Sequence, residues 1–228
     1  MEKVYMLHGF MGTSKSHFSS QIDYFKEKYE LVFLDLPGHG DSPLESTEDY
    51  FEHALEYVIS RLKVGGEGYL MGLSLGASLA VHISLREPEL VKGTILTGYT
   101  PYIPERLKEV MEKQYDYFIN IEENNTQIAQ SFENLHGNKW RKTLEHVLHT
   151  MTFKYPGISK ADFEKLNTPV LLLNGSNDKH EVEAVAYVKE NKEDALIGLI
   201  PGAGHTANLD QPDVFNRIVE DFLELRGS

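Results

Sequence analysis

Short runs of apolar residues recur along the chain, and the stretches between them repeat apolar residues at helical spacing. Each run is rich in Leu, Ile or Val and is bounded by glycine or polar residues, which is typical of a strand buried within a parallel sheet. Alternation of such strands with helices predicts an α/β protein with a mostly parallel, about six-stranded sheet flanked by helices. The predicted strands are Val4–Leu7, Leu31–Leu34, Gly68–Gly72, Gly93–Thr97, Val170–Leu173 and Leu196–Ile200.

Four segments carry the apolar period of an amphipathic helix. In the second of them, Tyr50, Ala54 and Val58 share one face. The third begins at Leu75 and ends before Pro88, because proline cannot continue a helix. The predicted helices are Ser16–Tyr29, Thr47–Leu62, Leu75–Leu85 and Pro212–Leu225.

The alternation breaks once, because no strand pattern occurs between Thr97 and Thr168. Three helical patterns fill this stretch, one over Pro104–Ile119, one with Ile128 and Phe132, and one around Trp140. The polar run from Glu122 to Thr126 is predicted to be a loop. An insertion of this length is too long for a bare loop, so we expect it to pack as a lid. The predicted domains are a core of residues 1–100 and 166–228 and a helical cap of residues 101–165.

Charge and composition narrow the classes of partner. The 228 residues carry a formal net charge of −13, and none of them is cysteine. Such a negative surface repels phosphate backbones and anionic lipid, so neither nucleic acid nor a membrane is an expected partner. The first residues run straight into a strand, and no apolar stretch approaches the ~20 residues that span a bilayer. With the lack of disulfides, this favours a cytoplasmic protein, while the oligomeric state stays open.

The segment Gly72-Leu73-Ser74-Leu75-Gly76 follows an apolar strand and opens a helix. A serine on such a tight strand-to-helix turn has a strained backbone, and glycine two residues to either side removes the steric collision. Ser74 then projects its hydroxyl above the sheet edge, where the N-terminus of the new helix favours developing negative charge. Ser74 is therefore the predicted nucleophile.

A glycine-flanked turn, His8-Gly9-Phe10-Met11-Gly12, follows the first strand and is expected beside Ser74. Ester hydrolysis passes through an oxyanion that must meet preorganised N–H donors. The amide of Leu75, directly after the nucleophile, is one expected donor, and the amide of Phe10 is preferred to that of Met11 as the other.

The predicted base is His205, in a loop that leaves the last strand and precedes the C-terminal helix. His8 and His39 lie in tight turns and are expected to bond local backbone. Asp178 follows the buried strand at 170–173 and is the predicted acid that orients the imidazole. The rivals of Asp178 are Glu181, Glu183 and Asp210.

Two further patterns are assigned no chemistry. The turn from Asp35 to Ser42, rich in glycine and proline, is interpreted as architecture after the second strand. The sequence has no phosphate-binding glycine loop after a strand, and no His–carboxylate spacing that favours a metal site, so neither a nucleotide phosphate site nor a metal site is expected.

Taken in order, His8-Gly9-Phe10, the Asp35–Ser42 turn, Gly72–Gly76, Asp178 and Gly204-His205 resemble the α/β-hydrolase superfamily over nearly the whole chain. The resemblance implies a parallel sheet with a helical cap, no cofactor, a triad of Ser74, Asp178 and His205, and an oxyanion hole from the Phe10 and Leu75 amides. The chain starts at what corresponds to the third strand of the family, so the fold is expected to lack its first two strands.

Three functions stay open at this point. The preferred hypothesis is a carboxylesterase that cleaves an ester of a small or medium acyl substrate through an acyl-enzyme on Ser74. A lyase or carbon–carbon hydrolase, similar to the menaquinone-pathway synthase, needs cationic residues in the cap; the candidates are Arg106, Lys108, Lys139, Arg141 and Lys142. A ligand-sensing role in signalling is the third, because the fold alone does not fix the function.

Overall fold

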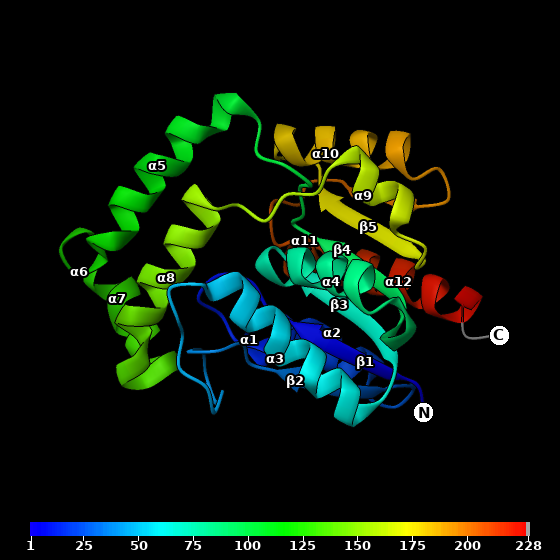
Figure 1. Ribbon diagram of the computed structural model, residues 1–228, viewed down its shortest axis with the longest axis horizontal. Helices are drawn as coiled ribbons and strands as arrows, with labels where there is room; N and C mark the ends of the chain where they lie inside the picture. The colour runs from blue at the N-terminus through cyan, green and yellow to red at the C-terminus, as the bar shows by residue number, and fades with distance from the viewer. Residues whose placement is uncertain (227–228) are drawn as a thin grey trace.

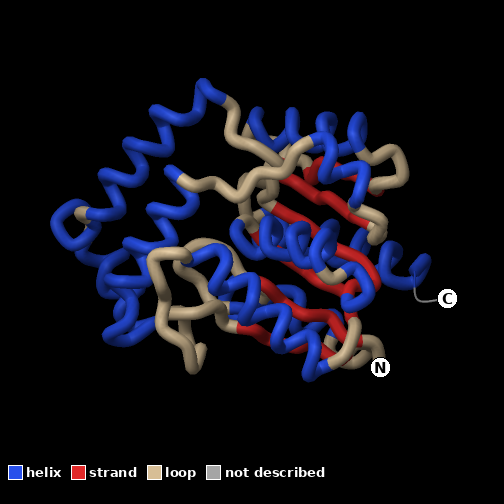
Figure 2. Tube along the Cα trace, in the orientation of Figure 1, coloured by secondary structure: helices blue, strands red, loops and turns tan. Residues whose placement is uncertain are grey.

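The computed structural model describes residues 1–226 and contains all six predicted strands in one sheet (Figures 1 and 2). Every neighbouring pair of strands is parallel, which confirms the predicted fold class. The strands are β1 (Lys3–Leu7), β2 (Glu30–Leu34), β3 (Gly68–Leu73), β4 (Val91–Thr97), β5 (Val170–Gly175) and β6 (Leu196–Ile200).

The strand order is β2-β1-β3-β4-β5-β6, so the chain reverses its direction of winding between β1 and β3. At the end of β1, Leu7 pairs with Leu34 of β2 on one side and with Gly72 of β3 on the other. Loops that leave neighbouring strands in opposite directions open a crevice at such a point, and open α/β sheets bind ligands there. The topology thus marks the ends of β1 and β3 as the place for a site.

Helices cover both faces of the sheet (Figure 1). Side chains alternate along each strand, so Tyr5 and Leu7 join one buried cluster while Val4 and Met6 join the other. Each fully buried Leu in these clusters contributes roughly 1.5–3 kcal/mol. One face is covered by α3 (Tyr50–Gly65), α4 (Leu75–Arg86), α9 (Lys160–Lys165) and α10 (Lys179–Asn191), and the other by α1 (Ser14–His17), α2 (Ser19–Phe25), α11 (Ala207–Asp210) and α12 (Pro212–Arg226).

The first predicted helix, Ser16–Tyr29, is two helices in the structure. Thr13 and Ser16 form a reciprocal capping box, which starts α1 earlier than predicted. Phe18 then leaves the helical region, with φ −123° and ψ 23°, and buries its ring completely in the core. Burial of this aromatic ring takes precedence over continuation of the helix.

The predicted insertion contains α5 (Glu105–Ile119), α6 (Ile121–Asn124), α7 (Thr126–His136) and α8 (Trp140–Phe153), as well as α9 at its end. Helices α5 to α8 lie beyond the carboxyl ends of the strands, at the left of Figure 1. The segment predicted as a loop is partly helical, because α6 covers residues 122–124 and Asn125 then caps α7 through its side chain.

A separate apolar cluster joins the insertion to the sheet edge. Ile121, Trp140, Leu144 and Leu148 pack around Met11, which belongs to the turn after β1. Helix α9 contributes Phe163 to the main core cluster. The division into core and cap at residues 101 and 165 stays a prediction. Within residues 1–226, no helix combines the length and apolarity that crossing a membrane requires.

Candidate active site

The predicted site residues all follow strands that end at the same edge of the sheet. The chain leaves β1 toward Phe10, β3 toward Ser74, β5 toward Asp178 and β6 toward His205. Because the sheet is parallel, these exits share one edge, and all four residues line one cavity there. The structure thus brings together segments that are up to 195 residues apart in the sequence.

Ser74 lies between β3 and α4 with φ 55° and ψ −113°, a conformation that non-glycine residues rarely adopt. Its amide donates to the Thr97 carbonyl (2.9 Å), and its own carbonyl accepts from the Ser78 amide (3.0 Å). The start of α4 and the end of β4 therefore hold the strained residue in place. Such over-determined strain is typical of a functional position.

The glycines that flank Ser74 allow this turn to pack against its neighbours. A Cβ on Gly76 would lie 1.9 Å from the Leu7 carbonyl oxygen, and a Cβ on Gly72 would lie 2.4 Å from the Gly76 oxygen. No side chain fits at such distances. Gly72 thus avoids the collision across the turn that we predicted, whereas Gly76 is required by the close approach of the chain leaving β1.

The turn after β1 runs alongside Ser74. A Cβ on Gly9 would lie 3.2 Å from the Cβ of Ser74, and Met11 has a positive φ of 46°. The Gly9 amide donates to Nδ1 of His17 (3.0 Å), and this hydrogen bond holds the turn in place. The phenyl ring of Phe10 packs edge-on against Phe118 of α5, with ring centroids 5.2 Å apart.

Leu75, the other predicted oxyanion donor, is the first residue of α4. Amides in the first turn of a helix have no partner within that helix, and the helix dipole adds partial positive charge there. An oxyanion formed on a substrate attached to Ser74 would meet this end of α4. The roles of the Phe10 and Leu75 amides stay predictions.

The imidazole of His205 is held by Glu181. Its Nδ1 lies 2.5 Å from Oε1 of Glu181, a carboxylate in the first turn of α10 that is fully buried. A carboxylate can only accept, so Nδ1 donates, and in the neutral ring Nε2 is left with its lone pair available. The second oxygen of Glu181 has no hydrogen-bond partner among residues 1–226.

Asp178, which we predicted as the orienting acid, makes no hydrogen bond to His205 in the structure. It occupies the N-cap position of α10, one turn before Glu181, and lines the cavity instead. Glu181 lies in the first turn of the helix, and its side chain, which is longer than that of Asp178, reaches Nδ1 of His205. Glu181 was one of the rivals considered from the sequence, and its helical register after Asp178 is the signal that could have favoured it.

Electrostatics favour the charged form of His205. Desolvation of the ring opposes its charge, but the hydrogen bond and charge of Glu181, together with the charge of Asp178, outweigh this effect. The pKa of His205 is therefore raised above its ordinary value of 6.5. An imidazole that gains a proton readily is suited to the role of a general base.

The His205 ring lies close to another turn that the sequence analysis did not single out. Gly98 follows β4 with φ +57°, and a Cβ there would lie 3.0 Å from Cε1 of His205. Among residues 1–226, the structure shows no hydrogen bond between Ser74 and His205, although both line the cavity. Catalytic hydrogen bonds are often longer before substrate binds and shorten in the complex.

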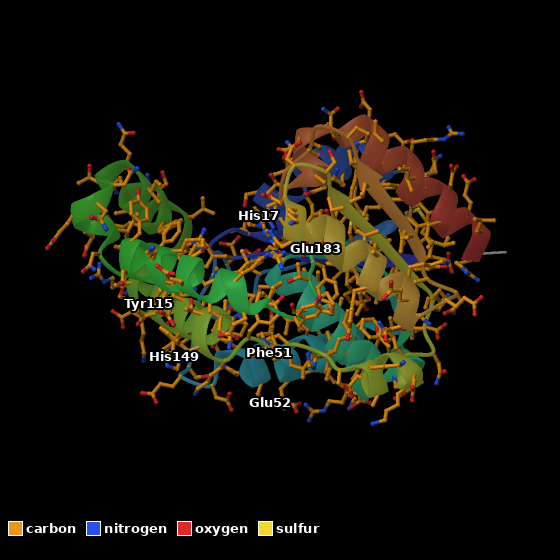
Figure 3. All side chains as sticks on the ribbon, turned by 90° about the horizontal axis from the view of Figure 1, so that it is seen from above. His17, Phe51, Glu52, Tyr115, His149 and Glu183 are labelled. Atoms are coloured by element: carbon orange, nitrogen blue, oxygen red, sulfur yellow. The ribbon has the colours of Figure 1, made fainter. Side chains whose placement is uncertain are left out.

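The cavity has a volume of about 460 Å³ and extends from Ser74 to the insertion. One wall of the cavity is largely apolar and comes from α5, the segment just before it, and α8. The residues that form this wall are Ile103, Leu107, Val110, Met111, Gln114, Tyr115, Phe118, Leu148, Met151 and Thr152. Figure 3 labels Tyr115 on α5 and, across the molecule, Glu183 on α10.

Several histidines near the site are structural. His8 donates from Nδ1 to the Gly9 carbonyl (2.8 Å) and accepts at Nε2 from the Leu36 amide (2.9 Å). His39 contacts the Pro37 carbonyl. Both rings are buried, which lowers their pKa values, to about 3 for His8. The prediction that these two residues bond local backbone is confirmed.

The turn from Asp35 to Ser42 is also structural, as predicted. The Asp35 carboxylate accepts from the amide and hydroxyl of Ser14 (2.9 and 2.8 Å) and from the Asp41 amide (3.0 Å). These hydrogen bonds outweigh desolvation and lower the pKa of Asp35. Within the described part of the chain, no group of three or more His, Asp or Glu side chains could hold a metal ion.

The model of the family described as "Alpha/beta hydrolase family" matches residues 4–218. The chain belongs to the α/β-hydrolase family. This match spans nearly the whole of the sequence, the insertion included. It agrees with the six-stranded parallel sheet, and it places the strained turn at Ser74 within a family of enzymes.

Individual α/β hydrolases are similar over their full length. The crystal structure of NosK from Streptomyces actuosus is 32% identical and has a TM-score of 0.91, covering 100% of this chain and 99% of that one. A putative 2-succinyl-6-hydroxy-2,4-cyclohexadiene-1-carboxylate synthase of Bacillus subtilis is 27% identical over 97% of this chain and 90% of its own length. A pimeloyl-[acyl-carrier protein] methyl ester esterase of Nitrosospira multiformis is 27% identical, covering 83% and 82%.

Proposed function

We propose that this α/β hydrolase cleaves a carboxylic ester of a small or medium acyl group through an acyl-enzyme on Ser74. The observation that carries the proposal is the hydrogen bond between Nδ1 of His205 and the buried Glu181, in the same cavity as the strained Ser74. That bond holds the imidazole in the tautomer whose Nε2 is free to act as a base. A methyl ester esterase among the relatives agrees with this reaction class.

The proposed reaction has two halves. Nε2 of His205 takes the proton of the Ser74 hydroxyl as Oγ attacks the carbonyl carbon, and the amides of Phe10 and Leu75 receive the oxyanion. The tetrahedral intermediate expels the alcohol, which takes the proton from His205 and leaves the acyl group on Ser74. His205 then removes a proton from water as that water attacks the acyl-enzyme. The second tetrahedral intermediate breaks its bond to Oγ of Ser74, which takes the proton back from His205 as the carboxylic acid leaves.

In this proposal Glu181 replaces Asp178 as the acid of the triad. Its burial gives the imidazolium a partner in a low-dielectric environment, where a charge pair is stronger than at the surface. The apolar wall of α5 and α8 receives the acyl group, and the volume of about 460 Å³ is suited to a small or medium chain.

The second candidate is the lyase or carbon–carbon hydrolase reaction, which is suggested by the synthase among the relatives. It acts on an anionic metabolite and needs cationic groups in the pocket. None of the five cationic candidates of the insertion lines the cavity. Arg106 pairs with Glu183, Arg141 pairs with Glu122, and Lys139 donates to the Gly40 and Ser42 carbonyls. The charge of the cavity therefore favours the ester.

Hydrolysis of p-nitrophenyl esters from acetate to decanoate tests the proposal. We expect turnover that peaks at a short or medium chain, and Ser74→Ala to lower kcat/KM by at least about 10³-fold. Mass spectrometry of the quenched enzyme should show the acyl group on the peptide that contains Ser74. Equal rates for the wild type and Ser74→Ala, or no turnover at any chain length, would contradict the proposal.

A further inference from the structure

The cavity contains a carboxylate that the proposed reaction leaves unused. Its lining includes Asp178, Glu181, His180 and His205, and no Lys or Arg among residues 1–226. Glu181 is committed to His205. The partly buried Asp178 makes no side-chain hydrogen bond or salt bridge within the described chain, so the wall of the cavity carries one unpaired negative charge.

Asp178 makes neither of the two local hydrogen bonds that its position offers, although its charge acts on His205. The N-cap position usually accepts an amide of the helix, but the Asp178 side chain makes no such bond. Asp210 accepts the amide of Gly204, at 2.8 Å, although the Asp178 carboxylate also lies near this glycine. Neither helix capping nor support of the His205 loop therefore accounts for this carboxylate in the cavity.

The carboxylate lies beside the loop of His205, because Oδ2 of Asp178 is 3.9 Å from the position that a Cβ on Gly204 would take. Asp178 is close enough for its charge to act on His205, which hands its proton to the departing alcohol. Helix α5, whose apolar residues also line the cavity, lies apart from α10 (Figure 1), and this apolar wall is suited to the acyl chain. A group attached to the alcohol would therefore meet Asp178.

We propose that Asp178 binds a cationic nitrogen in the alcohol part of the substrate, so that the enzyme selects esters of amino alcohols. This inference rests on the proposed function and adds the substrate class to it. The formal net charge of −13 acts in the same direction, because a negative protein raises the local concentration of cations and repels anions.

The test compares two esters of equal shape, butyrylcholine and 3,3-dimethylbutyl butyrate, with acid release measured by titration at pH 8. We expect kcat/KM to favour the cationic ester by about tenfold, the effect of one well-placed charge pair. Asp178→Asn should bring the ratio close to one, and 0.5 M NaCl should reduce the ratio in the wild type.

Glu183→Gln is the matched control, because it removes a charge from the same helix outside the cavity. It should keep the ratio of the two esters. A wild-type ratio of one, or a ratio that Asp178→Asn leaves unchanged, would overturn the inference while the ester-hydrolase proposal stands.

Binding provides a readout that does not depend on turnover. Calorimetry with choline should show binding to the wild type that is weakened several-fold in Asp178→Asn and retained in Glu183→Gln. If no ester is turned over, the proposed function fails, and this measurement still decides the role of Asp178. Equal choline binding by the wild type and Asp178→Asn would overturn that role.

Discussion

The two walls of the cavity are built differently. On the sheet side, Ser74 and the turn after β1 have positive φ angles that close packing enforces, and the glycines around them have no room for a Cβ. On the other side, α5 has no buried residue, and Val110 at its centre is 48% exposed. Its apolar face is turned toward the cavity. In the proposed reaction, the rigid sheet-side wall holds the reacting groups, and the more exposed wall of α5 meets the substrate.

This difference separates the residues that would carry out the proposed reaction from those that would select the acyl group. A site on strand ends and helix starts keeps its geometry, because moving any part of it would disrupt the core. Apolar residues of a helix that line a cavity can be substituted with little effect on folding. We therefore expect substitutions on the sheet side to alter rate or stability, and substitutions on α5 to alter the choice of acyl group.

The largest expected effect lies in the rigid wall. Glu181→Gln keeps the shape of the side chain but removes the charge that orients and stabilises the imidazolium of His205. We expect kcat/KM for a neutral ester to fall by about 10³-fold, mostly in kcat. Steady-state kinetics with p-nitrophenyl butyrate measures this loss.

The pH profile of kcat/KM tests which carboxylate is the acid of the triad. The base must be neutral, so kcat/KM rises with pH and is lost as the pH falls through the pKa of His205. Because that pKa is raised, the acidic limb of the wild type should lie above 6.5, and Glu181→Gln should move it downward. If Asp178→Asn instead caused the larger loss of kcat and the larger shift of the limb, Asp178 would be the triad acid.

A pair of leucine substitutions tests the comparison of the two walls directly. Leu172 is fully buried in β5, whereas Leu107 faces the cavity from α5. Leu172→Ala should lower the free energy of unfolding by about 3–4 kcal/mol, through lost burial and a new void. Leu107→Ala should cost less than about 1 kcal/mol and shift the preferred p-nitrophenyl ester toward longer chains.

Urea unfolding and a chain-length series measure both effects on both variants. The comparison would be wrong if Leu107→Ala were as destabilising as Leu172→Ala. It would also be wrong if Leu107→Ala left the chain-length preference unchanged.

The rigid wall is also the part that the sequence predicted well. Each strand is a short apolar run with little competing pattern, and Gly72 is required by crowding within the turn itself, so local reasoning was sufficient for the sheet and the turn at Ser74. The contact of Gly76 with Leu7 joins distant segments and could not be seen locally. His205 followed from its place after the last strand. The break at Phe18 was missed, because it depends on where the ring is buried in the folded core.

The partner of His205 could not be settled from the sequence. Asp178 and Glu181 are three residues apart at the start of one helix, and either carboxylate could reach an imidazole. Which of them does so depends on how α10 packs on the sheet, and there Asn174 donates to the carbonyls of Tyr99 and Glu181. The charge of the cavity could not be predicted from the sequence either. Ion pairs such as that of Arg106 with Glu183 join segments that are distant in the sequence.

A smaller effect than that of Leu172→Ala is expected for stability in acid, and it also belongs to the rigid wall. His17 supports the turn after β1 by accepting the Gly9 amide at Nδ1. Desolvation, with the nearby His205 and His136, lowers the pKa of His17 to about 4. The unfolded chain binds a proton at this residue near pH 6.5, before the folded chain does, so stability falls as the pH drops from 6.5 toward 4.

Between pH 7 and pH 4.5, His17 should account for about 2–3 kcal/mol of lost unfolding free energy, from the linkage of one pKa. His17→Asn places an amide oxygen near the position of Nδ1 and cannot titrate, so it should lose that much less than the wild type over the same interval. Urea unfolding at the two pH values measures the difference, and carboxylates that titrate in both proteins cancel. Equal losses in the two proteins would show that the turn beside Ser74 does not depend on a neutral imidazole, and that the packing of the glycines alone holds this wall of the cavity.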